Sequence, residues 1–445
     1  MMFHAESPHG PPISDGQLRT ALWAAFEAIG ERRRAVVVPP DITRRHSFAA
    51  RITGPAVEYY RDRIVDVLPA LGTHGAMTRG ELALMFGRVP QELFRVHRWK
   101  DDVETLGRIP AEFVYQRSEG RLSFDWPAQM NRLLLEGGHD LILCVGQVAP
   151  HEVVGMAGHS KTLFVGSGGR EAMNKSHYLG AVYGVERIMD RVDTPVRDLL
   201  VYAARRFAAH LPVVHVLTVV GWGTGNEPVL KGLFVGDDEE TFARAAELSL
   251  EVNLTLLEEP LEKVVVYLDP ATFKSTWVGN KAIYRTRMAM ADGGELVVLA
   301  PGVRQFGEDP GIDRLVRAHG YFSTEDVLER VRQSPELAEN LAAAAHAEGR
   351  FTITGSPAGL GPAEVERVNY RYLSPGKALE RYPPDRLRDG YNELPGGERV
   401  YYISNPAMGL WANRSRFSGR TPPSPPGWPS DRGAPQAPFA RGTRS

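Results

Sequence analysis

Residues 139–152, HDLILCVGQVAPHE, hold an apolar run that ends in a polar loop. The run is short, uncharged and rich in aliphatic side chains, which is typical of a strand buried on both faces. The same scheme recurs in three other stretches, at residues 34–44, 63–78 and 212–228. Because helical patterns separate these strands, the sequence predicts an α/β fold with a mostly parallel sheet covered on both faces.

The four predicted strands run into polar or glycine-rich loops at Asp41, His74, His151 and Gly221. In open α/β sheets, ligands bind outside the carboxyl ends of the strands. We therefore expect these loops to surround the functional site.

Two domains are expected, because 445 residues are too many for one ordinary core. We predict a larger Rossmann-like N-terminal domain at 1–260 and a smaller α/β C-terminal domain at 261–400, with the active site between them. The last strand and helix, from about 400–417, are expected to return to the first domain. The proline-rich residues 418–445 are predicted to form a disordered tail. Helices are expected at 17–33, 54–63, 238–258, 311–318, 324–332 and 336–348, with one more starting after a capping box of Thr78 and Glu81.

The composition is that of a soluble globular protein, with 43% hydrophobic and 24% charged residues. A net charge of −2 gives no reason to expect nucleic acid or a membrane surface as a partner. We expect no secretory signal at the N-terminus and no membrane-spanning helix. The single cysteine, Cys144, lies in an apolar run and is predicted to be buried; a chain without disulfides favours the cytoplasm.

Two stretches at strand ends carry candidate ligand-binding residues. In PPDITRRH, Asp41 and Thr43 are suited to bonding turn amides, and Arg44 to binding a phosphate or carboxylate. In GTHGAMT, His74 lies between small residues that leave room for a ligand. Each residue taken alone is equally compatible with an ordinary turn.

The stretch 151–177 gathers His151, Lys161 and His177. It contains none of the short-spaced histidine or cysteine pairs of zinc sites. Lysine can lose its proton and act as a nucleophile, and the chain has few lysines. The GSGG turn, with Gly166, Gly168 and Gly169, is suited to presenting backbone N–H groups to a phosphate, although most such turns are only turns.

Together, DITR, GTHGAMT, the spacing of His151, Lys161 and His177, and Lys281 in WVGNKAIYR resemble the nickel-dependent lactate racemase family. The resemblance spans about residues 35–300. It implies a nickel-pincer nucleotide, a pyridinium-3,5-bisthiocarboxylic acid mononucleotide that carries nickel, covalently attached at Lys161. It also implies a small-molecule 2-hydroxy acid as substrate and transient contact with cofactor-synthesis proteins.

The resemblance also assigns roles to other residues. His177 matches the nickel ligand, and His74 and His151 match the catalytic acid/base pair. Asp41 and Arg44 match residues near the cofactor and the active-site carboxylate, and Lys281 matches a substrate-binding lysine. With Asp41 and Arg44, we also expect Thr43 and the glycines of GSGG to contact the cofactor, and Arg44 to contact the substrate as well. Histidine suits acid/base work because its pKa is near neutral.

The implied reaction inverts C2 of a 2-hydroxy acid. Removing the C2 hydrogen as hydride, while a base takes the hydroxyl proton, avoids forming a carbanion beside a carboxylate. The product is a planar keto acid that can receive hydride on either face, so one histidine is needed on each side. Closure of the second domain is expected to exclude water from this intermediate.

The sequence departs from lactate-specific members at two positions. His159 in AGHSK replaces a glycine, and Val278 stands where a substrate-contacting glutamine is expected. We therefore expect a larger polar substrate such as an aldonate, with His159 contacting it or the cofactor phosphate and the loops 221–228 and 304–311 lining its site. Two alternatives stay open: a sugar-acid dehydratase or redox enzyme on the same scaffold, and a non-catalytic carrier of nucleotide or nickel.

Overall fold

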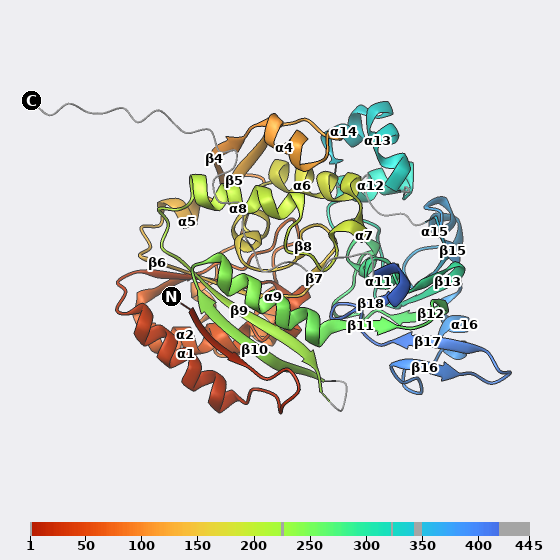
Figure 1. Cartoon of the computed structure of the whole chain (residues 1–445), viewed down its shortest axis with the longest axis horizontal. Coiled ribbons are helices and arrows are strands. Elements are labelled where there is room, and N and C mark those ends of the chain that lie inside the picture. The colour runs from red at the N-terminus through yellow and green to blue at the C-terminus, as the bar shows by residue number, and fades with distance from the viewer. Residues whose placement is uncertain (1, 224–226, 322–323, 342–348, 418–445) are drawn as a thin grey trace, which may run out of the picture.

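The first of two large sheets occupies the N-terminal half of this computed structural model (Figure 1), which describes residues 2–223, 227–321, 324–341 and 349–417. Its strand order is β1-β10-β9-β6-β2-β3. Neighbouring strands in the run β9-β6-β2-β3 are parallel, as predicted, whereas β10 and β1 add an antiparallel edge. The strands are β1 Met2–Glu6, β2 Ala35–Val38, β3 Ile64–Val67, β6 Leu141–Gln147, β9 Val213–Trp222 and β10 Pro228–Gly236.

Both faces of this sheet are buried, which explains the continuous apolar runs in its strands. On β6, Ile142 and Cys144 enter the core on one face, while Leu143 and Val145 enter the core on the other. Helices α1 Asp15–Ile29 and α2 Ala50–Tyr60 cover one face, and α6 Arg170–Tyr183 and α8 Pro195–Phe207 cover the other (Figure 1). Cys144 is therefore buried, as predicted, and burial raises the pKa of its thiol.

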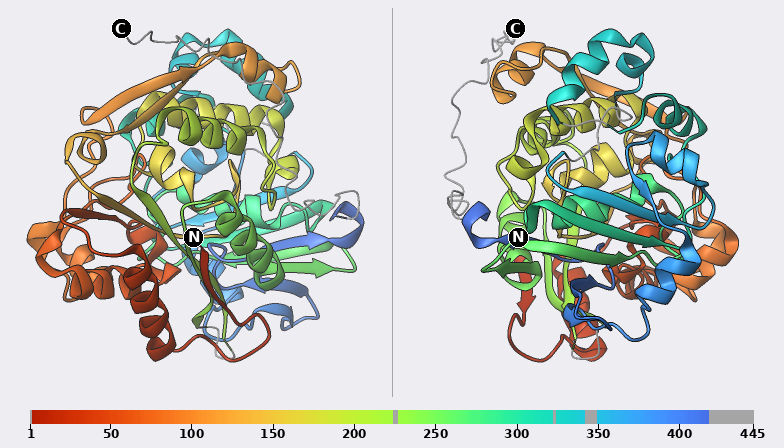
Figure 2. Two further views of the ribbon diagram at one scale, coloured as in Figure 1. Left: turned by 60° about the vertical axis from the view of Figure 1, so that its left-hand side comes forward. Right: turned by 90° about the vertical axis from the view of Figure 1, so that its right-hand side faces the viewer.

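The second sheet has the order β15-β14-β13-β12-β17-β16 and lies on the opposite side of the molecule from α1 and α2 (Figure 1; Figure 2, left). All its neighbouring pairs are parallel except β16 with β17. The chain passes from the first sheet to the second near residue 260. The strands are β12 Leu261–Tyr267, β13 Met290–Ala300, β14 Thr352–Pro357, β15 Arg371–Tyr372, β16 Gly390–Glu393 and β17 Arg399–Ile403.

Two small strands connect the end of the chain to the first half. Helix α9, Glu239–Asn253, is shorter than the predicted 238–258 because β11, Leu254–Leu257, follows it directly. This strand pairs in parallel with β18, Leu410–Asn413. The backbone at 254–257 is therefore extended, because its hydrogen bonds go to a partner about 155 residues away.

The helices after β13 depart from the predicted domain division. Helices α12 Pro310–His319, α13 Thr324–Gln333 and α14 Pro335–Glu339 lie beside α6 in Figure 1, and their apolar side chains join the core of the first half. These side chains are Leu315, Val327, Val331 and Leu337. Helices within residues 261–400 therefore pack in part against the first half, since an amphipathic helix buries its apolar face against whichever neighbour offers apolar surface. The predicted 336–348 extends to residues 342–348, which lie outside the described residues, as does the predicted tail at 418–445.

The remaining elements are short. The predicted capping box is present, since the Thr78 hydroxyl accepts from Glu81 N at the start of α3. No helix in the described ranges is long and apolar enough to cross a membrane. The other elements are α3 Arg79–Phe86, β4 Val103–Ile109, α4 Ala111–Arg117, β5 Trp126–Asn131, α5 Arg132–Glu136, β7 Pro150–His151, β8 Gly155–Met156, α7 Val185–Ile188, α10 Thr276–Gly279, α11 Lys281–Thr286, α15 Pro362–Arg367, α16 Pro375–Arg381 and α17 Arg414–Phe417.

Candidate active site

One cavity collects most of the predicted site residues. It opens at the carboxyl ends of β2, β3 and β6, and residues 277, 278 and 281 from the second half complete its wall. This is where ligands bind in open parallel sheets. The wall includes Asp41, Thr43, Arg44, His74, His151, Lys161, Gly166, His177 and Lys281.

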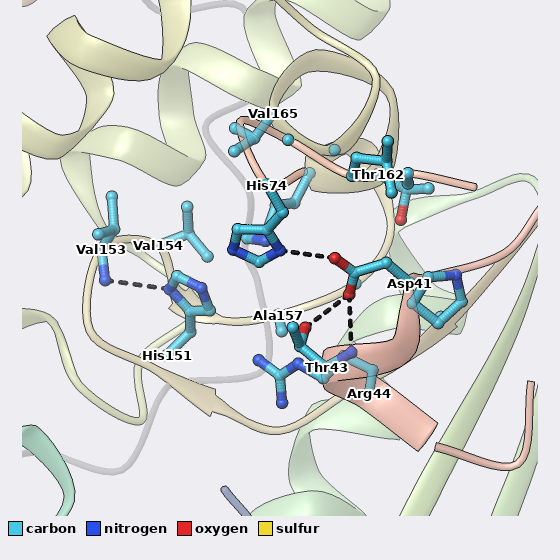
Figure 3. Close-up of a pocket in the computed structure, with 18 of the residues that line it drawn as sticks. Asp41, Thr43, Arg44, His74, His151, Val153, Val154, Ala157, Thr162 and Val165 are labelled. Atoms are coloured by element: carbon cyan, nitrogen blue, oxygen red, sulfur yellow. Dashed lines mark hydrogen bonds and ion pairs between the residues drawn. The ribbon is translucent and has the colours of Figure 1, made fainter. Parts of the chain in front are cut away.

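His74 is paired with a carboxylate (Figure 3). Its Nδ1 lies 2.6 Å from Oδ2 of Asp41, whose other oxygen accepts bonds from the backbone N (3.2 Å) and hydroxyl (2.5 Å) of Thr43. Burial opposes ionisation of Asp41, but His74 and these hydrogen bonds outweigh it and lower the pKa of the carboxyl. An ionised Asp41 holds the His74 proton on Nδ1, which leaves Nε2 with its lone pair free to act as a base.

His151 has the opposite arrangement (Figure 3). It lies on the hairpin of β7 and β8, and its Nδ1 accepts a hydrogen bond of 3.1 Å from Val153 N. Burial, together with the positive charges of Lys161 and Arg44, lowers the pKa of His151 far below its ordinary value. The ring is therefore neutral, with its proton on Nε2.

Two lysines enter the cavity with unusual acidity. Lys161 precedes a short π-helix, Thr162–Gly166, and Lys281 begins α11. Burial, with the nearby charge of Arg44, lowers the pKa of each to about 8. A substantial fraction of each amine is neutral near pH 7–8, and neutral amines are nucleophilic.

His177 on α6 is oriented like a metal-binding histidine. Its Nδ1 lies 2.9 Å from the carbonyl of Met173, so Nδ1–H donates and Nε2 keeps its lone pair. The ring of Trp277 stacks beside it, with centroids 6.1 Å apart. Within the described residues, no group of three His, Cys, Asp or Glu side chains is placed to hold a metal. A metal at His177 would therefore need further donors from a bound molecule.

The GSGG turn is packed more tightly than a phosphate loop requires. A Cβ on Gly168 would lie 2.0 Å from the Phe164 carbonyl oxygen, and one on Gly169 would lie 2.4 Å from Oε1 of Gln129. The same Gln129 oxygen accepts from the Ala172 amide at the start of α6. Gly166 lines the cavity, but Gly168 and Gly169 do not, and close packing explains these two glycines better than phosphate binding.

His159, which is predicted to contact the substrate, is not among the residues that line the cavity. This residue has a φ of +58°. The ring stacks on His215, with centroids 4.0 Å apart, and on Phe242. It therefore packs the loop before Lys161 against β9 and α9.

The two loops expected to line a larger site lie elsewhere. None of the described residues of 221–228 reaches the cavity, because β9 continues through Gly221 and pairs with β10. In the stretch 304–311, Glu308 and Asp309 line a smaller neighbouring pocket that shares Thr73, Met173 and Trp277 with the cavity. Val278 does line the cavity.

Gln147 and Glu152 are polar cavity residues that were not singled out from the sequence, as are Thr73 and Thr162. Gln147 ends β6, and Glu152 directly follows His151. The sequence feature that could have identified Gln147 and Glu152 is their position at the end of a predicted strand.

Comparisons with known proteins show which proteins this chain is similar to. Residues 23–187 match the family model described as the lactate racemase N-terminal domain. A lactate racemase from Thermoanaerobacterium thermosaccharolyticum is 24% identical over 286 residues, which is 60% of this chain and 60% of that protein. The chain thus matches less than two thirds of the length of this curated relative.

Two solved structures share the fold. A Thermotoga maritima protein superposes with a TM-score of 0.79 at 23% identity, covering 92% of this chain and all of that one. The lactate racemase apoprotein from T. thermosaccharolyticum superposes with a TM-score of 0.64 at 18% identity, covering 90% and 93%. The resemblance drawn from the motifs is thus confirmed over residues 23–187, which match the model of the lactate racemase N-terminal domain.

Proposed function

We propose that the protein is a racemase or epimerase that inverts C2 of a 2-hydroxy acid. The observation that carries the proposal is the pair of imidazoles in one cavity, with a free Nε2 on His74 and an Nε2–H on His151. A base and a proton donor of the same residue type suit a reaction that is nearly symmetric about one carbon.

The residues fit the nickel-pincer nucleotide that the family relationship implies. Lys161 offers a buried amine that is neutral enough to form a covalent attachment, and His177 offers one imidazole nitrogen to nickel. Nickel accepts imidazole together with soft sulfur donors, which agrees with the lack of a complete protein ligand set in the described residues. When bound, this cofactor supplies a hydride acceptor for the C2 hydrogen.

The chain itself would bind the acid and move its hydroxyl proton. Arg44 and Lys281 carry positive charge into the cavity and would hold the substrate carboxylate. Nε2 of His74 would take the hydroxyl proton, and ionised Asp41 would stabilise the imidazolium that forms. Walls contributed by both halves of the chain would keep water from the keto acid.

The substrate is proposed to be larger and more polar than lactate, with an aldonate as the leading candidate. Polar side chains of Thr73, Gln147 and Thr162 line the cavity and offer hydrogen bonds to further hydroxyl groups. A panel of 2-hydroxy acids from lactate to aldonates, scored for inversion, tests this choice.

Two measurements on protein made with the cofactor-synthesis proteins test the function. The intact mass should rise by one cofactor, and Lys161→Ala should abolish the rise, whereas Lys377→Ala at an exposed position should not.

Deuterium at C2 should be retained in the inverted product, because hydride does not exchange with water. Washout into solvent would instead indicate a carbanion, and a keto or dehydrated product would indicate a redox enzyme or a dehydratase. A bound cofactor with no turnover of any acid would indicate a carrier.

A further inference from the structure

Glu152 lies in the cavity wall directly after His151. Its Oε2 is buried, has no hydrogen-bond partner among the described residues, and lies 4.0 Å from Nδ1 of His151. A buried carboxylate oxygen without a donor is costly, so its place beside an imidazole calls for an explanation.

The other histidine of the pair shows what such a carboxylate does. Asp41 lies 2.6 Å from Nδ1 of His74, which fixes the proton there and frees Nε2. At His151 the corresponding nitrogen is instead bonded to the Val153 amide. Glu152 is thus near the nitrogen that Asp41 contacts in the first pair, but about 1.4 Å farther away.

The bond from Val153 is compatible with only one state of His151. If Nε2 is to accept a proton, the ring must already carry its other proton on Nδ1. A protonated Nδ1 cannot face the Val153 N–H, because both groups are donors. The neighbouring acceptor is Oε2 of Glu152.

We infer that Glu152 is the positioning residue of a second carboxylate–imidazole pair, in which it replaces the Val153 amide at Nδ1 of His151 during turnover. This inference rests on the proposed function. A proton from solvent would convert resting His151, which carries Nε2–H, into an imidazolium whose Nδ1–H donates to Glu152. The imidazolium then gives its Nε2 proton to the keto oxygen, and in the opposite direction Nε2 takes that proton back from the hydroxyl.

The charges around the pair favour this role. Burial opposes ionisation of Glu152, but Lys281 and Arg285, joined by His151 when its ring is protonated, outweigh it and hold the pKa of the carboxyl well below its usual range. The cations near His151 are Lys161, Arg44 and Arg285, and Glu152 is the anion that offsets them. Without Glu152, a protonated His151 would lose the anion that offsets these three cations.

The tautomer of His151 can be read directly by nitrogen NMR of protein labelled with ¹⁵N-histidine, with and without cofactor. The His151 signals are assigned by their loss in His151→Gln. Oxalate, a planar mimic of a 2-keto acid, is then added to the wild type, to the isosteric Glu152→Gln variant and to the shorter acid Glu152→Asp. Glu259→Gln, at an exposed carboxylate, is the matched control.

We expect oxalate to convert Nδ1 of His151 from an acceptor to a protonated nitrogen in the wild type and control, partly in Glu152→Asp, and not in Glu152→Gln. Inversion by the loaded Glu152→Gln enzyme should fall about 10-fold or more, the loss expected when an imidazolium loses its carboxylate partner. Equal spectra for wild type and Glu152→Gln, or no conversion in the wild type, would overturn the inference. Failure of the loaded wild type to invert any acid would refute the proposed function instead, because the spectra do not depend on turnover.

Discussion

The two sides of the cavity hold the same residue type in different ways. His74 lies on a loop after β3, its side chain is 26% exposed, and a carboxylate holds its Nδ1. His151 lies on the β7–β8 hairpin, its side chain is 9% exposed, and a backbone amide occupies its Nδ1. The group bonded to Nδ1 therefore decides which imidazole ring starts as a base and which starts as a donor.

Removing either imidazole should have the largest effect. In loaded enzyme, His74→Gln and His151→Gln should each lower kcat by about 10⁴-fold, because each loses the group that transfers the hydroxyl proton on its side. Intact mass should still show the cofactor at Lys161 in both variants. A variant that kept more than about a tenth of wild-type kcat would mean that its side of the cavity does not take part.

Replacing the carboxylate of the first pair should have a smaller effect. In Asp41→Asn, the amide can donate to Nδ1 of His74, which moves the ring proton to Nε2 and removes the free base. We expect kcat to fall about 10–100-fold, as when partners that orient catalytic or metal-binding histidines are lost. Nitrogen NMR of His74 should show the changed tautomer, and an unchanged tautomer would contradict this account.

This contrast also marks what the sequence could predict. The apolar runs of β2 and β6 defined the sheet, and the topology rule then brought Asp41, His74 and His151 to one edge. The sequence could not place His159, because its positive φ and its stacking on His215 depend on backbone geometry and on a distant strand. Nor could it predict β11, whose extended backbone depends on pairing with β18.

Glu152 shows the same limit at the site itself. From the sequence, a glutamate after a loop histidine is expected to be a solvated charge. The fold instead buries Glu152 beside cations from α11. Its partners Lys281 and Arg285 are more than a hundred residues away, so local spacing carries no sign of the contact. The features that the sequence predicts well depend on the pattern within one strand or helix. The features that it misses depend on how two such elements pack against each other.

Lys161, whose charge helps to lower the pKa of His151, has a lowered pKa itself. Because burial and the charge of Arg44 lower its pKa to about 8, the amine is protonated below that pH and neutral above it. In the chain without cofactor, the rate of carbamylation by cyanate at Lys161 should therefore level off above about pH 8. An ordinary exposed lysine reacts ever faster up to its pKa of about 10.4. Peptide mass mapping measures both rates in one sample, and a rate at Lys161 that rises beyond pH 9 would contradict the shift.

The smallest effect should come from the hairpin that carries His151. Gly155 has a φ of +80°, and a Cβ there would lie 2.0 Å from the carbonyl oxygen of Arg191. Gly293 has nearly the same φ, +79°, with open space around it, so Gly293→Ala reports the cost of the backbone conformation alone. We expect Gly155→Ala to lower the free energy of unfolding by about 1–3 kcal/mol more than Gly293→Ala in urea titrations, because the added methyl must displace backbone. If the two variants lost equal stability, the hairpin would be free to shift, and the Val153 amide would not be held firmly enough to set the tautomer of His151.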